Sequence, residues 1–231
     1  MFASAARSKS DQELAKFLLR ACHDLRASAR AVLSHSELFA KDARTAADRE
    51  AEQRLGFIVE GARRIDLLLD GLAAYSVALQ TDPSSFQLVR MDVVLRLALA
   101  KLEPELRACE AEVEYGELPA LTGNPDRLMQ VFECLLRNAV DHRGRLAPRI
   151  RIDAARHPDG WIFAVRDNGP GVETASLEAI FLPFERAPGA EPARPGMGLA
   201  ICRAIVERHG GRAWAESQPG CGAGICFTLP A

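Results

Sequence analysis

From residue 11 to residue 80, apolar side chains recur at alternating spacings of three and four, and no proline interrupts them. This rhythm is the seam of a coiled coil or helical bundle, so we predict two long helices. The polar stretch KDARTAADRE separates them, and its Asp42 and Asp48 suit turn and N-cap positions. The seam positions are Leu14, Leu18, Ala21, Leu25, Val32 and Phe39 on the first helix, and Leu55, Ile58, Ala62, Ile65, Leu69, Leu72 and Leu79 on the second.

A hairpin of two helices cannot bury apolar stripes on both of its sides. Two hairpins bury these stripes by pairing, so we expect a dimeric four-helix bundle and therefore a homodimer.

The pattern changes at the stretch QTDPSSFQLVR, where Pro83 ends the helix and two serines mark a linker. Beyond it, strand-like and helix-like segments alternate, which predicts an α+β fold with a two-layer α/β sandwich. We place the domain boundary at residue 80, with a hairpin in residues 1–80 and a second domain in residues 81–231. The predicted strands are 86–89, 113–118, 150–154, 161–165, 213–216 and 225–229, and the predicted helices are 93–109, 126–140 and 199–209.

Composition narrows the class of protein. Hydrophobic residues make up 48% of the chain and charged residues 26%, and the net charge is −2, so nothing predicts nucleic-acid binding. No apolar run approaches the roughly 20 residues of a membrane span, and the N-terminus lacks the apolar core of a signal peptide. The 6 cysteines form no C-x-x-C pair, so we expect reduced thiols and a cytoplasmic protein.

Two histidines lie on the first predicted helix. His35 falls on the seam register, where a histidine is most simply a packed or solvated residue. His23 falls on the outer side, directly before Asp24. A carboxylate that orients one imidazole nitrogen leaves the other free as a nucleophile, so His23 is a candidate catalytic residue.

Three segments of the second domain carry further candidate residues. The amphipathic stretch DRLMQVFECLLRNAVDH ends with Asn138 and His142. The apolar run before DNGPGV leads to Asp167, followed by Gly169 and Gly171. The stretch GMGLAICRAIVERHGG opens an apolar helix with Gly196, Gly198 and Leu199, and the free N–H groups of such a helix start suit phosphate. Each segment alone also has a plain structural reading as a cap or a turn.

Taken in order, these segments resemble the catalytic core of two-component sensor histidine kinases, from about residue 11 to residue 230. ACHDLRASAR resembles the H-box of the dimerisation and histidine-phosphotransfer hairpin. LLRNAVDH resembles the N-box, DNGPG the G1 box, IFLPFER the F-box and GMGLAICRAIVERHGG the G2 box. The tail GCGAGICFTLP is similar to the closing glycine-rich strand of that family.

The resemblance implies a nucleotide site that binds ATP and Mg²⁺. Asp167 would accept a hydrogen bond from the adenine amino group, and Asn138 would hold Mg²⁺ through its amide oxygen. Gly196 and Gly198 would present N–H groups to the phosphates. The remaining nucleotide-contact positions implied by the resemblance are His142, Gly169, Gly171, Phe184 and Leu199. Phe181 and Phe184 would pack beneath a lid over residues 186–195.

The same resemblance implies that His23 takes the γ-phosphoryl group of ATP, with Asp24 polarising the imidazole. The phosphoryl group would then pass to an aspartate of a response-regulator receiver domain.

Some positions depart from the family pattern. Ala27 stands where a Thr or Asn is common, which leaves phosphatase activity unsupported. The usual H-box proline is Ser28, Cys134 replaces an Asn, Asp141 replaces a Lys or Arg near the phosphates, and Arg194 and Pro195 replace a Gly and a Thr. Two alternatives therefore stay open: a phosphotransfer relay that has lost ATP binding, and a dimeric pseudokinase. ATP hydrolysis ranks low because Glu133 is one residue out of the required spacing.

Overall fold

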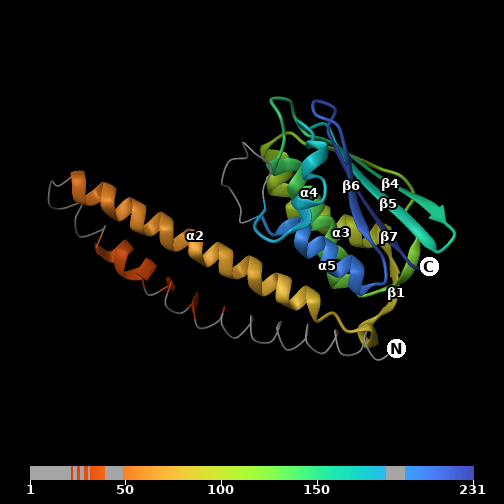
Figure 1. The fold of residues 1–231 in the computed structure, drawn as a ribbon, viewed down its shortest axis with the longest axis horizontal. Coiled ribbons are helices and arrows are strands. Elements are labelled where there is room, and N and C mark those ends of the chain that lie inside the picture. The colour runs from red at the N-terminus through yellow and green to blue at the C-terminus, as the bar shows by residue number, and fades with distance from the viewer. Residues whose placement is uncertain (1–21, 23–24, 27–28, 31, 40–48, 186–195) are drawn as a thin grey trace. The chain divides into compact units, whose positions relative to one another are not determined.

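The computed structural model describes residues 22, 25–26, 29–30, 32–39, 49–185 and 196–231 of the chain (Figure 1). The chain separates into two compact units, with the division between Val77 and Ala78. The predictions made for His23, Asp24 and the lid at residues 186–195 lie outside the described residues.

The first unit is helical, as predicted. Helix α2 spans Arg49–Leu79, and the described residues at 22, 25–26, 29–30 and 32–39 are helical as well. Cys22, Ala29 and Leu69 form one buried cluster, against which Leu72 and Ala73 pack. Because this cluster joins residues of both helical segments, apolar packing holds the hairpin together.

Ion pairs add to the packing between the two segments. Arg26 bonds Asp70 at 2.6 Å and lies 3.7 Å from Asp66, one turn away on α2. Arg63 bonds Glu37 at 3.1 Å. These exposed or partly exposed pairs fix the register more than they stabilise the unit.

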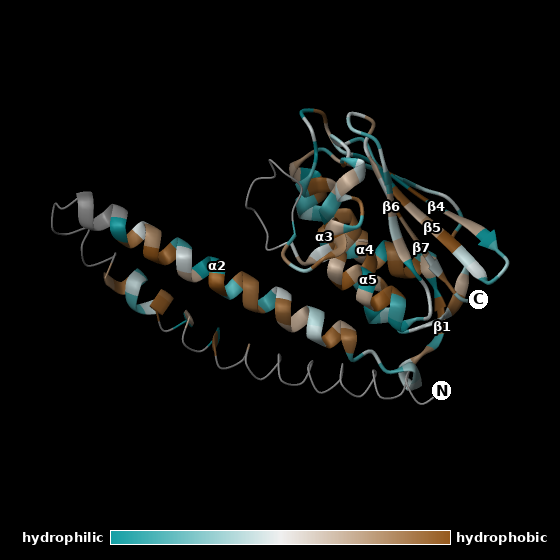
Figure 2. Cartoon of the chain, viewed as in Figure 1, coloured by the Kyte–Doolittle hydropathy of each residue, from teal (hydrophilic) through white to brown (hydrophobic). Residues whose placement is uncertain are grey.

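Within the single chain, only part of the predicted seam is buried. On the first helical segment the buried residues are Cys22 and Ala29, whereas Leu25, Val32 and Phe39 are 51–60% exposed. On α2, Leu55, Ala62 and Leu69 are buried at every seventh position, but Ile58 and Ile65 are 48% and 50% exposed. Figure 2 shows hydrophobic residues alternating with hydrophilic ones along the coloured part of α2. The spacing of apolar residues identifies apolar positions but does not indicate which neighbouring helix each one faces. His35, which the same spacing places on the seam, is exposed.

The second unit is a two-layer α/β sandwich, as predicted. Its five-stranded sheet has the order β2-β4-β5-β7-β6, in which β2 pairs parallel to β4 and the other pairs are antiparallel. The strands are β2 (Glu112–Tyr115), β4 (Arg149–His157), β5 (Gly160–Asp167), β6 (Ala213–Ser217) and β7 (Ala223–Leu229).

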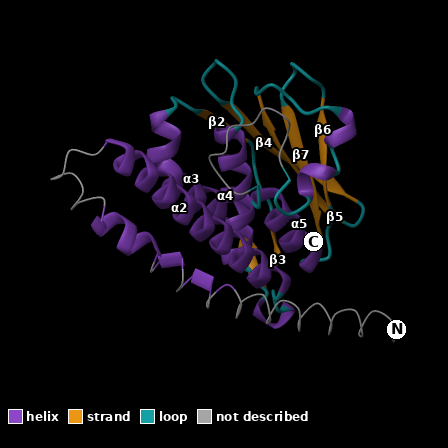
Figure 3. Ribbon diagram, turned by 60° about the vertical axis from the view of Figure 1, so that its left-hand side comes forward, coloured by secondary structure: helices purple, strands orange, loops and turns teal. Residues whose placement is uncertain are grey.

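Three helices cover one face of this sheet (Figure 3). They are α3 (Met91–Ala108), α4 (Pro125–Asp141) and α5 (Gly198–Arg208), and α4 packs against both of the others. Phe163 and Phe227 stack at 4.9 Å inside the sheet, and Phe132 of α4 meets Phe227 edge-on at 6.4 Å. All three rings are fully buried, so they form the centre of the core.

The second unit also has a two-stranded sheet, of which only the first strand was predicted. β1 (Gln87–Arg90) pairs antiparallel with β3 (Ala120–Gly123), and a short 3-10 turn at Pro83–Ser85 precedes β1. The sequence pattern predicts no strand at β3, because four residues with one buried apolar side chain, Leu121, show no clear alternation of apolar and polar positions.

The six cysteines are all free, as expected, and burial raises the pKa of the Cys202 thiol well above its ordinary value. Within the described residues, none of the helices has the length and apolar character that a membrane span requires.

Candidate functional site

The carboxylate of Asp167 lies half-buried at the end of β5. Its Oδ1 accepts the backbone N–H of Gly169 at 2.8 Å and that of Ala223 at 3.2 Å. Its Oδ2 accepts no hydrogen bond from the residues that the structure describes. Burial raises the pKa of Asp167, while the two N–H groups and the positive charge of a protonated His142 act against that rise. One carboxylate oxygen is thus fixed by the backbone, and the other is available to a ligand.

Two glycine-rich loops meet at this carboxylate. A Cβ on Gly169 would lie 2.8 Å from both Asp167 Oδ1 and the carbonyl oxygen of His142. Gly171 has a φ of 76°, and a side chain there would also run into the carbonyl of Gln218. These glycines are therefore required by the close approach of the chain, in agreement with the tight loop expected at DNGPG.

The tail loop supplies residues that sequence reasoning missed. Ala223 gives the second N–H to Asp167, and Gly222, with a φ of 81°, passes directly against the Asp167 carbonyl. The N–H of Gly220 donates to the carbonyl of Pro170 at 2.7 Å. The only sequence signal for this contact was the glycine-rich motif GCGAG in the tail.

Helix α4 brings two predicted residues to the same place. Asn138 is half-buried, and its side chain makes no hydrogen bond with the described part of the chain. Its carbonyl accepts the N–H of His142 at 3.0 Å, which ends the helix, and the exposed His142 in turn borders Gly169. The C-terminal turn of α4 and the loop after Asp167 therefore form one continuous surface.

The start of α5 presents free N–H groups. Met197 is the N-cap residue and is buried, Gly198 is the first helical residue, and Leu199 is buried. Gly196 adopts a φ of 72° and accepts the N–H of Phe184 at 3.1 Å. A Cβ on Gly198 would meet no described atom within 4 Å, so the packing around it does not require a glycine. The open space and the helix dipole together suit an anion.

The two phenylalanines of the predicted F-box behave differently. Phe181 is buried, and the Arg203 guanidinium lies 4.4 Å above its ring while also bonding Glu178 at 2.8 Å. Phe184 is 47% exposed and has a left-handed φ of 67°. The contact of these rings with the predicted lid lies outside the described residues.

Glu133, considered above as a base for hydrolysis, is held in an ion-pair network toward α3. It is 6% exposed, bonds Lys101 at 2.8 Å and lies 3.7 Å from Arg137. Arg137 also reaches Glu105 at 3.3 Å. A carboxylate held by two cations is a poor general base, because both of them occupy its oxygens.

The structure thus brings together His142, Asp167, Gly169 and Gly171 and places Asn138 one turn before His142. Among the described residues, no group of three or more His, Cys, Asp or Glu side chains could hold a metal ion.

Comparisons with known proteins bear on this site. Residues 123–231 match the family described as "Histidine kinase-, DNA gyrase B-, and HSP90-like ATPase". The chain is 37% identical over 223 residues to cyanobacterial phytochrome A of Nostoc sp., covering 96% of this chain and 29% of the relative. It is 30% identical over 233 residues to the sensor histidine kinase ZraS of Klebsiella oxytoca, covering 98% of this chain and 48% of the relative.

The chain therefore spans less than half the length of either relative. Among solved structures, the histidine kinase ThkA in complex with the response regulator protein TrrA matches with a TM-score of 0.66. That match has 20% identity and covers 98% of this chain and 66% of ThkA, so it supports the fold alone.

Proposed function

We propose, from the premise that this chain belongs to the histidine kinase family and carries the catalytic core of a sensor histidine kinase, that it phosphorylates its own His23 with ATP. An imidazole nitrogen of His23 would bond to the γ-phosphorus while the bond to the bridging oxygen breaks and ADP leaves. Asp24 would orient the imidazole. A receiver-domain aspartate would then take the phosphoryl group and regenerate the free histidine.

The observation that carries this proposal is the state of Asp167. Its Oδ1 is occupied by two backbone N–H groups, which leaves Oδ2 as a hydrogen-bond acceptor without a partner among the described residues. Adenine presents an amino donor at the position where guanine presents a carbonyl acceptor. A carboxylate here therefore favours ATP over GTP, because GTP would place two acceptors against each other.

The phosphates fit the start of α5. No atom of the described residues stands where a side chain on Gly198 would be, and no side-chain cap from those residues uses the first N–H groups of the helix. This arrangement gives a polyphosphate both hydrogen-bond donors and the positive end of the helix dipole.

Mg²⁺ fits the site through Asn138. The amide of Asn138 has no bond to the described residues, and its oxygen is a ligand type that Mg²⁺ accepts. When bound, Mg²⁺ would neutralise part of the phosphate charge. Asn138 would hold it in place, one helical turn from the Asp167 loop.

Two observations weigh against the rivals. A phosphotransfer relay without ATP binding would not need the intact loop that holds Asp167, Gly169 and Gly171. ATP hydrolysis by Glu133 is disfavoured by its bonds to Lys101 and Arg137. A pseudokinase differs from the leading proposal only in activity, so experiment must separate them.

The partners follow from the same proposal. A response-regulator receiver domain would accept the phosphoryl group; the solved structure of the histidine kinase ThkA holds that protein in complex with the response regulator protein TrrA. A second copy of this chain would cover the apolar residues that the hairpin exposes, namely Leu25, Val32, Phe39, Ile58 and Ile65. We place the reaction in the cytoplasm, where ATP is available.

The test is incubation of the purified chain with Mg²⁺ and γ-labelled ATP, beside the variant His23→Ala. We expect acid-labile, alkali-stable label on the wild type and none on the variant. His35→Ala, a change at an exposed histidine of the same helical segment, is the matched control and should retain full labelling. Label that survives in His23→Ala would remove His23 as the nucleophile. ATP binding without label on any variant would favour the pseudokinase.

A further inference from the structure

The segment that follows α2 is fastened to the catalytic unit by two side chains. The ring of Phe86 stacks on the ring of His209, with centroids 4.4 Å apart and planes 8° from parallel. Directly before it, Ser85 accepts a hydrogen bond from the Asn124 side-chain amide at 2.9 Å. Both contacts lie within the second compact unit, and no part of the nucleotide site takes part in them.

The ring of His209, on which Phe86 stacks, is itself rigidly held. Its Nδ1 lies 2.8 Å from the carbonyl of Ile205, and its Nε2 accepts the backbone N–H of Asn124 at 3.0 Å. The ring is 6% exposed, and a Cβ on Gly123 would lie only 3.0 Å from its Cδ2. With both nitrogens bonded and no free space beside it, the ring offers Phe86 a fixed platform.

Asn124 ties this platform to α4. Its backbone N–H bonds His209, its side-chain oxygen accepts the N–H of Arg127 as the N-cap of α4, and its side-chain nitrogen donates to Ser85. One residue therefore connects the linker, the start of α4 and the last turn of α5.

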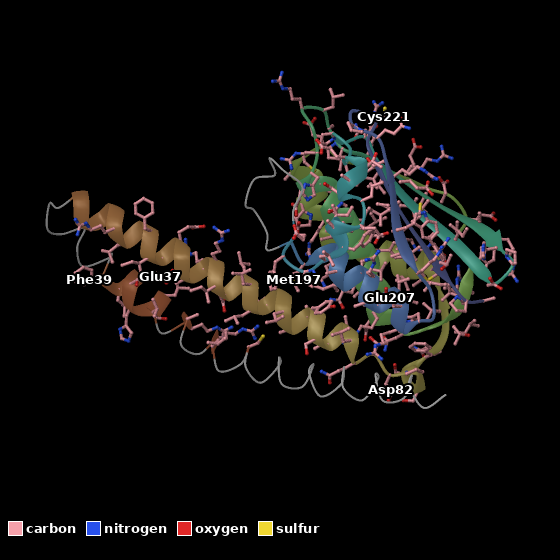
Figure 4. All side chains as sticks on the ribbon, in the orientation of Figure 1. Glu37, Phe39, Asp82, Met197, Glu207 and Cys221 are labelled. Atoms are coloured by element: carbon pink, nitrogen blue, oxygen red, sulfur yellow. The ribbon has the colours of Figure 1, made fainter. Side chains whose placement is uncertain are left out.

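The other ends of these two helices carry the nucleotide site. Asn138 lies in the last turn of α4, and Gly198 begins α5. In Figure 4 the labelled Met197 and Glu207 mark the two ends of α5, and Asp82 marks the linker. The linker is thus fastened at the ends of α4 and α5 that lie opposite the residues assigned to Mg²⁺ and phosphate.

The linker around Phe86 is also internally rigid. Asp82 accepts the N–H of Ser84 through its side chain and that of Ser85 through its carbonyl, and Phe86 donates its N–H to Pro83. Residues 82–86 therefore move with the catalytic unit, and any pivot between the hairpin and that unit lies on the N-terminal side of Asp82.

We propose that the Phe86–His209 stack is the anchor that positions the catalytic unit for phosphoryl transfer to His23, and that Phe86 and His209 are positioning residues. This inference rests on the proposed kinase function. Breaking the stack would release residues 82–86 from the rest of the catalytic unit. The ATP site would keep its affinity for nucleotide, but the γ-phosphoryl group would meet His23 in fewer of the accessible arrangements.

The experiment compares three changes in the full chain: Phe86→Ala, Phe86→Tyr and Leu88→Ala. Tyr keeps the aromatic stack at a half-buried position. Leu88 is 76% exposed two residues further on, so its truncation controls for the loss of an apolar side chain without an anchor. The readouts are the rate of His23 phosphorylation at saturating ATP and the Kd for ATP.

We expect Phe86→Ala to lower the phosphorylation rate about tenfold while the Kd for ATP stays within about twofold. Phe86→Tyr should restore most of the rate, and Leu88→Ala should match the wild type. A rate loss that parallels a loss of ATP affinity would overturn the proposal, because the stack would then be a structural support of the site. An equal loss in Leu88→Ala would overturn it as well.

A second measurement separates this inference from the kinase proposal. If the wild type takes no label, the proposed function fails, and amide hydrogen exchange at Ser85 and Phe86 still tests the anchor. The inference predicts that these amides exchange about tenfold faster in Phe86→Ala than in the wild type. Equal exchange in the two proteins would show that the stack does not hold the linker.

Discussion

The backbone N–H of Ala223 reaches the carboxylate of Asp167 at 3.2 Å, although the two residues are 56 positions apart in the chain. The last strand therefore completes the environment of the residue that we assign to adenine. Burial raises the pKa of Asp167, so the folded protein holds this charged carboxylate at a cost to stability that an exposed carboxylate would not carry. Such a cost to stability is typical of a group retained for binding.

This gives the first prediction. Asp167→Asn should raise the melting temperature without nucleotide, because the amide oxygen can still accept both N–H groups without a buried charge. The same change should weaken ATP binding about 10- to 100-fold, as expected for loss of a hydrogen bond to a charged group. Differential scanning fluorimetry and isothermal titration calorimetry measure the two effects. Asp159→Asn, at a side chain that is 93% exposed, is the control and should change neither.

The second prediction concerns pH. Burial lowers the pKa of His209 below its ordinary value of 6.5. The unfolded chain then binds a proton at a higher pH than the folded chain does, so stability is full above pH 6.5 and falls as pH drops from there to the folded pKa.

Urea unfolding of the wild type and of His209→Gln between pH 7.5 and pH 5.5 tests this. The wild type should lose stability with a slope of at most about 1.4 kcal/mol per pH unit beyond that of the variant. Parallel slopes for the two proteins would contradict the neutral, doubly bonded state of the His209 ring.

Glu133 yields a third prediction. Glu133→Gln should reduce the free energy of unfolding by about 1–3 kcal/mol, because Lys101 and Arg137 lose a buried anionic partner. ATP affinity should stay within about twofold, since the residue faces α3. The matched control is Glu103→Gln, which removes a half-exposed pair with Arg107 and should cost less than about 0.5 kcal/mol. A large loss of phosphorylation at unchanged stability would instead assign Glu133 to the chemistry.

The fourth prediction concerns the apolar residues exposed on the hairpin. Ile65→Glu should convert the proposed dimer to a monomer, because it places a charge in the surface that a second copy would bury. Sedimentation velocity at several protein concentrations measures this. Phe57→Glu introduces the same charge on α2 at a 79% exposed side chain outside the predicted seam, and it should leave the dimer intact. A monomeric wild type would remove the second copy as the occupant of this surface.

The sequence predicted the local parts of the site better than the contacts between distant parts. The α4 and α5 helices and the loop after Asp167 were visible because each has its own period or glycine spacing. The strand β3, the contact of Ala223 with Asp167 and the pairing of Lys101 with Glu133 were not. These depend on which segments the folded chain brings together, and no periodicity within one segment encodes that.

The hairpin shows the same limit in another form. The seam rhythm identified apolar positions on both helical segments, yet Cys22 and Ala29 pack inside the chain while Leu25 and Val32 stay exposed. In a bundle of four helices every helix has two neighbours, and a heptad pattern does not say which neighbour an apolar side chain faces. Assigning the exposed set to a second copy therefore needs the oligomeric state as evidence.

The open space at Gly198 also bears on what a genetic screen for loss of signalling would recover. A change to Ala at Gly211 or Gly222 places a Cβ against a backbone carbonyl, so the mutant protein should be degraded and scarce in the cell. A change to Ala at Gly198 meets no described atom and gains helix propensity, so the mutant protein should accumulate normally. Its added methyl group would stand at the helix start that we assign to phosphate, so this protein should be silent. In a strain that also carries the wild-type allele, the abundant, silent form would titrate the partner and act as a dominant-negative allele, whereas the unstable forms would be recessive.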